Sequence, residues 1–267
     1  AGGNPNRRPN SDVIRPRCIG QDITSRSSDS FVIDFGNMSV EQAAMYVVPF
    51  EHIRTHVYPM RQQANQASAR EKWWIHWNSR PEMRAALDPL ERYVATSRVG
   101  KHRTFVWLDS AILPDTALVV FARSDNYFFG VLHSWCHEIW SRRMGTQLRD
   151  AVSGFRYTST TTFETYPFPW PPGQEPAGDP RVEAIAEAAC NLVALRDAWL
   201  NPPDADERDL RARTLTNLYN RRPTWLEHAH RALDEAVFAA YGWPADLEDE
   251  EVLARLLALN LERAGQA

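Results

Sequence analysis

Residues 123–172, RSDNYFFGVLHSWCHEIWSRRMGTQLRDAVSGFRYTSTTTFETYPFPWPP, decide how the chain is organised. The stretch begins as an apolar, aromatic run and continues as a helical pattern with Trp135, Ile139 and Met144 on one side. It ends in a segment rich in prolines and aromatic residues. Because proline lacks a backbone N–H and has a fixed φ, this end cannot be a central strand or a helix interior. We expect an extended strap across a domain, and its anchors would be Phe163, Tyr166, Phe168 and Trp170.

Upstream of this stretch, short strands alternate with helices. Buried or alternating runs predict strands over residues 13–19, 30–36, 93–96, 104–108 and 117–122. Helical spacing predicts helices over residues 39–48, 50–60 and 79–90, the first opened by Ser39 and the last entered at Pro81. Residues 1–12 have no apolar periodicity and read as an arm or linker.

Downstream, composition changes at residues 173–180, GQEPAGDP, which we interpret as a linker. Helices are predicted over residues 181–200, 205–219, 224–241 and 249–264, with Gly242 and Pro244 ending the third. The predicted fold class is an α/β (α+β) domain over residues 13–172, followed by a small all-α domain over residues 181–267.

Composition indicates a globular protein. The chain has 267 residues, of which 43% are hydrophobic and 24% charged, which is enough to bury a sizeable core. It has no apolar run of about 18 residues that could span a membrane and no signal core near its start, so we expect a cytoplasmic location. Cys18, Cys136 and Cys190 are an odd, widely spread set, which favours free thiols over disulfides.

The net charge is unevenly distributed. Residues 1–172 hold 20 Lys and Arg against 16 Asp and Glu, a net charge of +4, whereas residues 173–267 hold 10 against 18, a net charge of −8. Only the first part is a plausible partner for a polyanion. Its cationic residues are almost all arginine, which suits bidentate contacts with phosphates and guanine edges. A GC-rich coding sequence would also favour arginine over lysine.

Three motifs leave alternatives open. The aromatic run Trp73–Trp77 fits either a core clamp or a surface for nucleic acid or a partner domain. His133, Cys136 and His137 have the form H-x-x-C-H, which fits either a metal site or an apolar helix with a core cysteine. Asn201-Pro-Pro-Asp204 is close to the Asn-Pro-Pro-aromatic motif of amino-methylating DNA methyltransferases, but Asp204 cannot stack on a flipped base. We therefore expect no catalytic, metal-binding or cofactor-binding residue in this chain.

The segments YFFGVLHSW and RYTSTTTFETYPFPWPP resemble the target-recognition domain of large DNA methyltransferases. The similar group is the MmeI-like, adenine-specific enzymes of restriction–modification and phage-defence systems. RTLTNLYNRRPTWLEHAHRALDEAVFAAYGWP resembles the C-terminal domain of that family. The resemblance implies a domain that selects the DNA sequence for methyl transfer from S-adenosylmethionine to adenine N6. The start of the chain looks cut from something longer, so the catalytic domain and the cofactor would belong to an upstream part of the same polypeptide.

Double-stranded DNA is therefore the expected partner. A basic loop between two predicted strands could present side chains to base edges in a groove. Its candidates are Arg98, Lys101, His102 and Arg103, with Lys101 and Arg103 facing the same way if the segment is extended. Candidates for phosphate contacts are Arg80, Arg84, Arg142 and Arg143. The resemblance adds Arg156, Tyr157 and Thr158, which could be structural, contact phosphate or do both.

Two other classes of function stay open at this point. One is a self-contained enzyme that uses the histidines or the Asn-Pro-Pro segment. The other is a protein-interaction module in which the tryptophan run and the acidic helices bind protein. The salt dependence of binding distinguishes a protein-interaction module from a DNA-binding domain, because arginine–phosphate contacts weaken steeply as salt rises.

Overall fold

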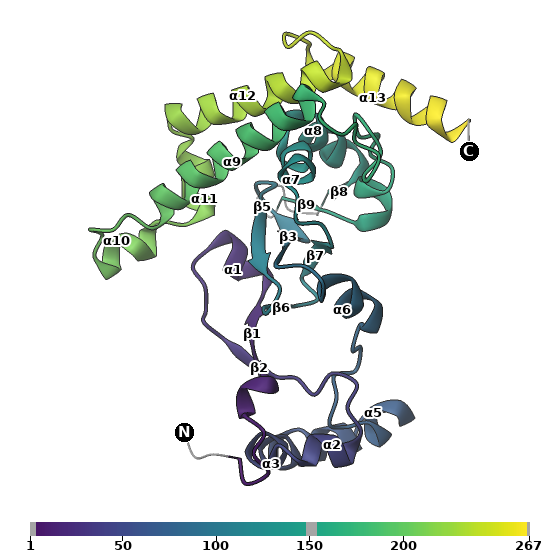
Figure 1. The fold of residues 1–267 in the computed structure, drawn as a ribbon, viewed down its shortest axis with the longest axis vertical. Coiled ribbons are helices and arrows are strands. Elements are labelled where there is room, and N and C mark those ends of the chain that lie inside the picture. The colour runs from purple at the N-terminus through teal and green to yellow at the C-terminus, as the bar shows by residue number, and fades with distance from the viewer. Residues whose placement is uncertain (1–3, 148–153, 266–267) are drawn as a thin grey trace. The chain divides into compact units, whose positions relative to one another are not determined.

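The chain forms two compact units in the computed structural model, which describes residues 4–147 and 154–265 (Figure 1). The first unit comprises residues 1–18, 28–91 and 109–114, and the second comprises residues 19–27, 92–108 and 115–267. The chain therefore passes between the units more than once. Each unit is described by itself.

The first unit contains a small sheet of order β2-β1-β6, made of β1 (Ile14–Cys18), β2 (Phe31–Ile33) and β6 (Leu113–Pro114). β1 and β2 are antiparallel, whereas β1 and β6 are parallel. A 3-10 turn, η1 (Asn10–Asp12), precedes β1. The helices of the unit are α2 (Val40–Ala44), α3 (Val47–His56), α4 (Tyr58–Gln62), α5 (Ala67–Glu71) and α6 (Pro81–Leu87).

Aromatic residues make the core of the first unit. Buried Phe35 packs against Tyr46 and Phe50, and Phe50 packs on Trp73 with ring centroids 5.4 Å apart. The indole N–H of Trp74 donates to the carbonyl of Met38 at 2.9 Å. For these two tryptophans the core interpretation of the aromatic run is therefore confirmed.

The start of α2 follows the predicted signal. The Ser39 hydroxyl accepts a hydrogen bond from the N–H of Gln42, and the Gln42 side chain accepts one from the N–H of Ser39. This reciprocal capping box satisfies two amide donors that the first turn of a helix leaves free.

The second unit contains two small sheets and a short helix, α1 (Gly20–Thr24). The first sheet has the order β5-β3-β7, from β3 (Arg92–Ser97), β5 (Phe105–Asp109) and β7 (Leu118–Phe121), and β3 is antiparallel to β7. The second has the order β4-β9-β8, from β4 (Val99–Gly100), β8 (Thr146–Gln147) and β9 (Phe155–Arg156). Most strands were predicted as apolar runs, but the two-residue strands of the second sheet carry no such pattern.

Helices complete the second unit. They are α7 (Asn126–His133), α8 (Trp135–Met144), α9 (Pro180–Leu200), α10 (Glu207–Ala212), α11 (Leu215–Arg221), α12 (Thr224–Tyr241) and α13 (Asp249–Ala264). α9 packs on both α7 and α12. The single helix predicted over residues 205–219 is two helices, because Thr214 caps α11 by accepting from the N–H of Asn217 and so interrupts the helix. Within the described residues, no helix is both long and apolar enough to cross a membrane.

The proline-rich strap lies against the C-terminal helices. Tyr166 and Phe168 are buried anchors as expected, and the Phe168 ring stacks on Phe128 at 5.5 Å. The Arg263 side chain donates to the carbonyl of Phe168 at 2.6 Å, and the Tyr241 hydroxyl donates to that of Pro167 at 2.8 Å. The first part of the strap is not extended, since η3 (Ser159–Phe163) is a π-helical turn.

The predicted domain boundary at residues 173–180 does not coincide with the boundary between the two compact units. Residues 115–172 and the helices that follow belong to one compact unit. Arg26 contributes to the same unit by donating to the carbonyls of Leu200 and Leu210, each at 2.7 Å. A composition change marks a surface connection here, but packing and hydrogen bonds join its two sides.

Candidate nucleic-acid interface

The β4-β9-β8 sheet brings three separate basic segments together in the second unit. Val99 pairs with Arg156, and Arg156 pairs with Thr146. Because directly opposed residues point to the same face of a sheet, the side chains of these three residues lie in one row. All three are exposed, whereas Phe155 on the other face is buried. The row is an exposed surface with an arginine at its centre, and we call it the β9 face.

Glycine is required where β9 approaches β4. Gly154 has a φ of +82°, and a Cβ added there would lie 2.1 Å from the carbonyl oxygen of Gly100. A side chain at Gly154 would push β9 away from β4. The pairing that forms the β9 face therefore depends on this residue.

The predicted loop from Arg98 to Arg103 is held by main-chain bonds and by a helix. The Arg98 N–H donates to Ala117, and the Arg98 carbonyl accepts from Tyr157, each at 2.8 Å. Lys101 Nζ and His102 Nε2 lie 2.8 Å and 2.9 Å from the side-chain oxygen of Asn220 at the end of α11. Asn220 was missed by the sequence analysis because no local pattern links it to a loop over a hundred residues away.

The expectation that Lys101 and Arg103 face the same way is wrong. Lys101 is exposed, but Arg103 is 5% exposed and points inward. Its guanidinium lies between the rings of Phe155 and Tyr157, at 4.7 Å and 4.9 Å from their centroids, and donates to Thr96 Oγ1 at 3.1 Å. Burial lowers the pKa of Arg103 to about 10, which leaves it charged at neutral pH. Arg103 therefore stabilises the loop from inside and presents nothing to a groove.

The segment Arg156-Tyr157-Thr158 divides in the same manner. Arg156 is exposed at the centre of the β9 face, but Tyr157 is fully buried, and its hydroxyl lies 3.0 Å from His137 Nε2. Thr158 is half-buried, and its N–H donates to the Thr162 hydroxyl at 3.2 Å. In this segment only the arginine is displayed to a large partner.

The end of α8 adds two exposed arginines. Arg142 forms an ion pair with Glu138 one turn earlier, and Arg143 has no ion-pair partner among the described residues. Thr146 of the β9 face follows Arg143 after two residues. Arg143 is therefore the better placed of the two for a contact with an anionic partner.

Arg80 and Arg84 belong to the first unit. Arg84 is engaged inside it, since its guanidinium binds the buried Asp34 carboxylate through two hydrogen bonds of 2.6 Å and 3.0 Å. Arg80 has an exposed side chain at the start of α6. Of these two, only Arg80 is free to meet a ligand.

The histidines of the H-x-x-C-H motif have structural partners. His133 Nε2 accepts from the N–H of Phe105 at 3.2 Å and from the Arg196 guanidinium at 2.7 Å, and His137 Nδ1 lies 2.7 Å from the carbonyl of Leu132. Burial and the nearby Arg196 charge lower the pKa of His133 well below its ordinary value. Among the described residues, no group of three or more His, Cys, Asp or Glu side chains is arranged to hold a metal ion. Asn201 of the Asn-Pro-Pro segment accepts from Arg26 at 2.7 Å, so this side chain too is part of the scaffold.

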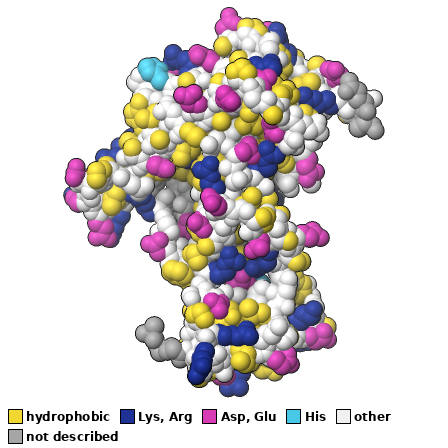
Figure 2. Space-filling view, viewed as in Figure 1, with side chains coloured by type: hydrophobic (Ala, Val, Ile, Leu, Met, Phe, Trp, Pro, Cys, Tyr) yellow, Lys and Arg dark blue, Asp and Glu magenta, His cyan; other side chains and the backbone are white. Residues whose placement is uncertain are grey.

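Charge on the outer helices is mixed. Over α9, α12 and α13 the view in Figure 2 shows acidic side chains interspersed with basic and apolar ones. Such a surface offers a polyanion no continuous attraction.

The fold has a solved counterpart. The chain is similar in structure to MmeI, a type IIL restriction–modification enzyme determined in complex with DNA, with a TM-score of 0.72 and 18% sequence identity. The similarity covers 96% of the present chain and 32% of that chain, so the present chain spans about a third of the length of the enzyme it matches. No protein-family profile matches the sequence, and no curated protein matches it. At this identity the likeness shows a shared fold, in which a mixed α/β region is followed by helices.

Proposed function

We propose that this chain is the DNA sequence-recognition part of an S-adenosylmethionine-dependent, adenine-N6 DNA methyltransferase of the restriction–modification type. The structural likeness to an enzyme solved with DNA, over about a third of its length, carries the proposal. Methyl transfer and cofactor binding would belong to another part of the same polypeptide. Phage defence would be the setting of the parent enzyme.

The β9 face supports this role. Arg156, Lys101 and Arg143 are exposed around one small sheet, and none forms an ion pair among the described residues. Exposed arginines and lysines attract phosphates, and an arginine fork can also read a guanine edge. The interior bonds of Arg103 and the Asn220 side chain hold the loop that carries Lys101 in place before binding. A surface ordered in advance loses less conformational entropy when it binds.

The test uses the intact parent enzyme in its host, with N6-methyladenine mapped across the genome. We expect Lys101→Ala/Arg156→Ala to change or relax the methylated motif, because direct contacts to bases or the positioning contacts beside them are lost. Arg255→Ala on α13, a residue in an i,i+4 pair with Glu251, is the matched control and should leave the motif intact.

Two outcomes would contradict the proposal at different levels. A native enzyme that leaves no methylated adenine would remove the methyltransferase assignment. Full methylation of an unchanged motif by the double variant would remove Lys101 and Arg156 from DNA recognition. A salt titration of DNA binding tests the same two residues. Each lost phosphate contact should reduce the steepness of the fall of log K with log salt by about 0.9.

A further inference from the structure

The open edge of β7 is the first of two features that lie together in the second unit. β7 is the last strand of the order β5-β3-β7, so among the described residues no strand pairs with its outer side. The Arg98 N–H donates to Ala117, and the register pairs Thr96 with Val119 and Val94 with Phe121. Since hydrogen-bonded pairs alternate in an antiparallel ladder, the backbone N–H and C=O of Val120 point away from β3. The Leu118 carbonyl points the same way but already accepts from Arg98 Nε at 3.5 Å, so the part of this edge that can accept a further strand is at Val120.

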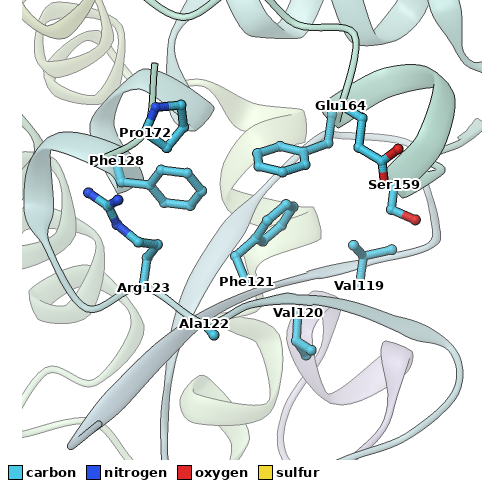
Figure 3. A pocket seen from close by; sticks show the side chains of 10 residues that line it. Val119, Val120, Phe121, Ala122, Arg123, Phe128, Ser159, Glu164 and Pro172 are labelled. Atoms are coloured by element: carbon cyan, nitrogen blue, oxygen red, sulfur yellow. The ribbon is translucent and has the colours of Figure 1, made fainter. Parts of the chain in front are cut away.

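The second feature is a pocket beside that edge, with a volume of about 300 Å³. Its walls include Val119, Ala122 and three phenylalanines, Phe121, Phe128 and Phe163. The three rings are mutually tilted at 61° to 73°, with centroids 4.7 Å to 5.9 Å apart. In Figure 3, Phe121 and Phe128 lie around the opening, with Pro172 above it and Glu164 at its rim. The volume is at the small end for ligand pockets and suits one long side chain.

The charges at the pocket select the chemistry of that side chain. Arg123 is neutralised by Asp125 at 2.7 Å and Glu175 at 3.0 Å, and the exposed Glu164 has no ion-pair partner among the described residues. One guanidinium against three carboxylates leaves a net charge of −2. This surface repels phosphate and attracts a cation. The aromatic rings add to the attraction, and the Arg123 guanidinium already lies over Phe128 at 5.3 Å.

We propose that this region binds an extended polypeptide segment of a protein partner. The segment adds a strand to β7 and places a Lys or Arg side chain into the phenylalanine pocket, with its cationic end near Glu164. Backbone hydrogen bonds to Val120 supply affinity that is independent of sequence, and the pocket supplies the specificity. The site is distinct from the β9 face and does not depend on DNA recognition, because its charge is of the opposite sign.

The first experiment is selection of random peptides displayed on phage against the purified chain. The expected result is enrichment of sequences with a Lys or Arg between β-branched residues. Selection against Glu164→Arg should lose this preference, whereas Glu187→Arg, an exposed acidic position on α9, should keep it. No enrichment, or enrichment of acidic or purely apolar sequences, would overturn the proposal.

A second measurement tests the two parts of the contact separately. A fluorescent peptide Thr-Val-Lys-Val-Thr is compared by anisotropy with analogues that carry norleucine or glutamate in place of lysine. We expect the lysine peptide to bind about tenfold more tightly than the glutamate peptide, and Glu164→Gln to reduce its advantage over norleucine about fivefold. N-methylation of alternate peptide amides should weaken binding about tenfold, because it blocks strand pairing. Equal binding of the methylated and unmethylated peptides would remove strand addition from the proposal.

Discussion

Both compact units hold arginine side chains in internal contacts, but they stabilise the charge by different means. Arg84 in the first unit is half-buried, whereas Arg103 and Arg196 in the second are almost fully buried. In the first unit, Arg84 meets the Asp34 carboxylate, and the two charges compensate each other. In the second unit, the guanidinium groups of Arg103 and Arg196 contact carbonyl groups, a hydroxyl, aromatic rings and a histidine. Arg84 is therefore stabilised by an ion pair, whereas Arg103 and Arg196 are stabilised mainly by dipoles and aromatic rings.

The difference appears in the pKa values of the surrounding groups. Burial by itself raises the pKa of Asp34, but the Arg84 hydrogen bonds and charge outweigh it and leave the pKa lowered. Burial lowers the pKa values of His137 and His230 to about 3, and the Arg196 charge adds to the effect on His230. These histidines stay uncharged at neutral pH, so they add no further positive charge beside the buried guanidinium groups of the second unit.

The largest effect is expected from breaking the ion pair of the first unit. Arg84→Met leaves the buried Asp34 carboxylate without its arginine, and should lower the free energy of unfolding of that unit by about 4 kcal/mol. Amide hydrogen exchange in α3 and β2 measures this loss. Asp34→Asn/Arg84→Met removes the stranded charge and should recover part of the stability. Equal losses in the single and double variants would show that the pair is not what stabilises the unit.

The second effect is the response of the second unit to acid. His133, His137 and His230 have lowered pKa values when folded, so the unfolded chain binds more protons below pH 6.5 and stability falls as pH drops. Asp234 opposes them, since burial raises its pKa to about 7 and the folded state takes up its proton first. Burial also raises the pKa of Asp197, which opposes them in the same direction at lower pH. With three histidines opposed by Asp234, the unfolded chain binds about two more protons than the folded chain. The free energy of unfolding therefore falls by about 3 kcal/mol for each pH unit between 6 and 5.

Urea unfolding at pH 7, 6 and 5 measures the change of the unfolding free energy with pH. In His230→Gln this dependence should correspond to about one proton fewer. Asp34 contributes only at lower pH, because its pKa is lowered in the folded state and its stabilising charge is lost as pH falls through that lowered pKa. Stability that is unchanged between pH 7 and 5 would contradict the neutral-histidine account of the second unit.

The smallest effect separates buried from displayed arginine within the second unit. Arg103→Met keeps apolar volume between Phe155 and Tyr157 but leaves Thr96 and backbone carbonyls without their donor, at a cost of about 2 kcal/mol. Arg156→Met on the β9 face should cost less than about 0.5 kcal/mol, because that side chain is exposed. Urea unfolding of both variants makes the comparison. A mild effect at both positions would mean that the solvent reaches Arg103.

Local signals were enough for much of the secondary structure. Ser39 with Gln42 predicted the start of α2, and the apolar spacing over residues 224–241 with Gly242 after it predicted α12 and its end. These signals are local because a cap or a helix face involves residues within a few positions of each other. The division of residues 205–219 was missed because Thr214 can serve as a helix residue or as a cap, and its neighbours decide between the two.

The candidate site was predicted less well than the helices. The basic loop was identified, but the burial of Arg103 and Tyr157 was not, since an arginine or tyrosine in a short polar or mixed segment has no local pattern that tells interior from surface. The open edge of β7 and its pocket were not predicted either. They combine residues from β7, α7 and the strap that are distant in sequence.

Local sequence patterns were sufficient to predict the order and type of most elements, the aromatic anchors of the strap and the acidic character of the last helices. These features follow from residue spacing, proline chemistry and composition, all of which act over short distances along the chain. Tertiary contacts determine which arginines are displayed and which are buried, and they join residues 115–172 to the later helices in one unit. The physical reason is that burial of a charged side chain depends on hydrogen-bond partners and rings supplied by remote segments, as Phe155 and Tyr157 supply them to Arg103.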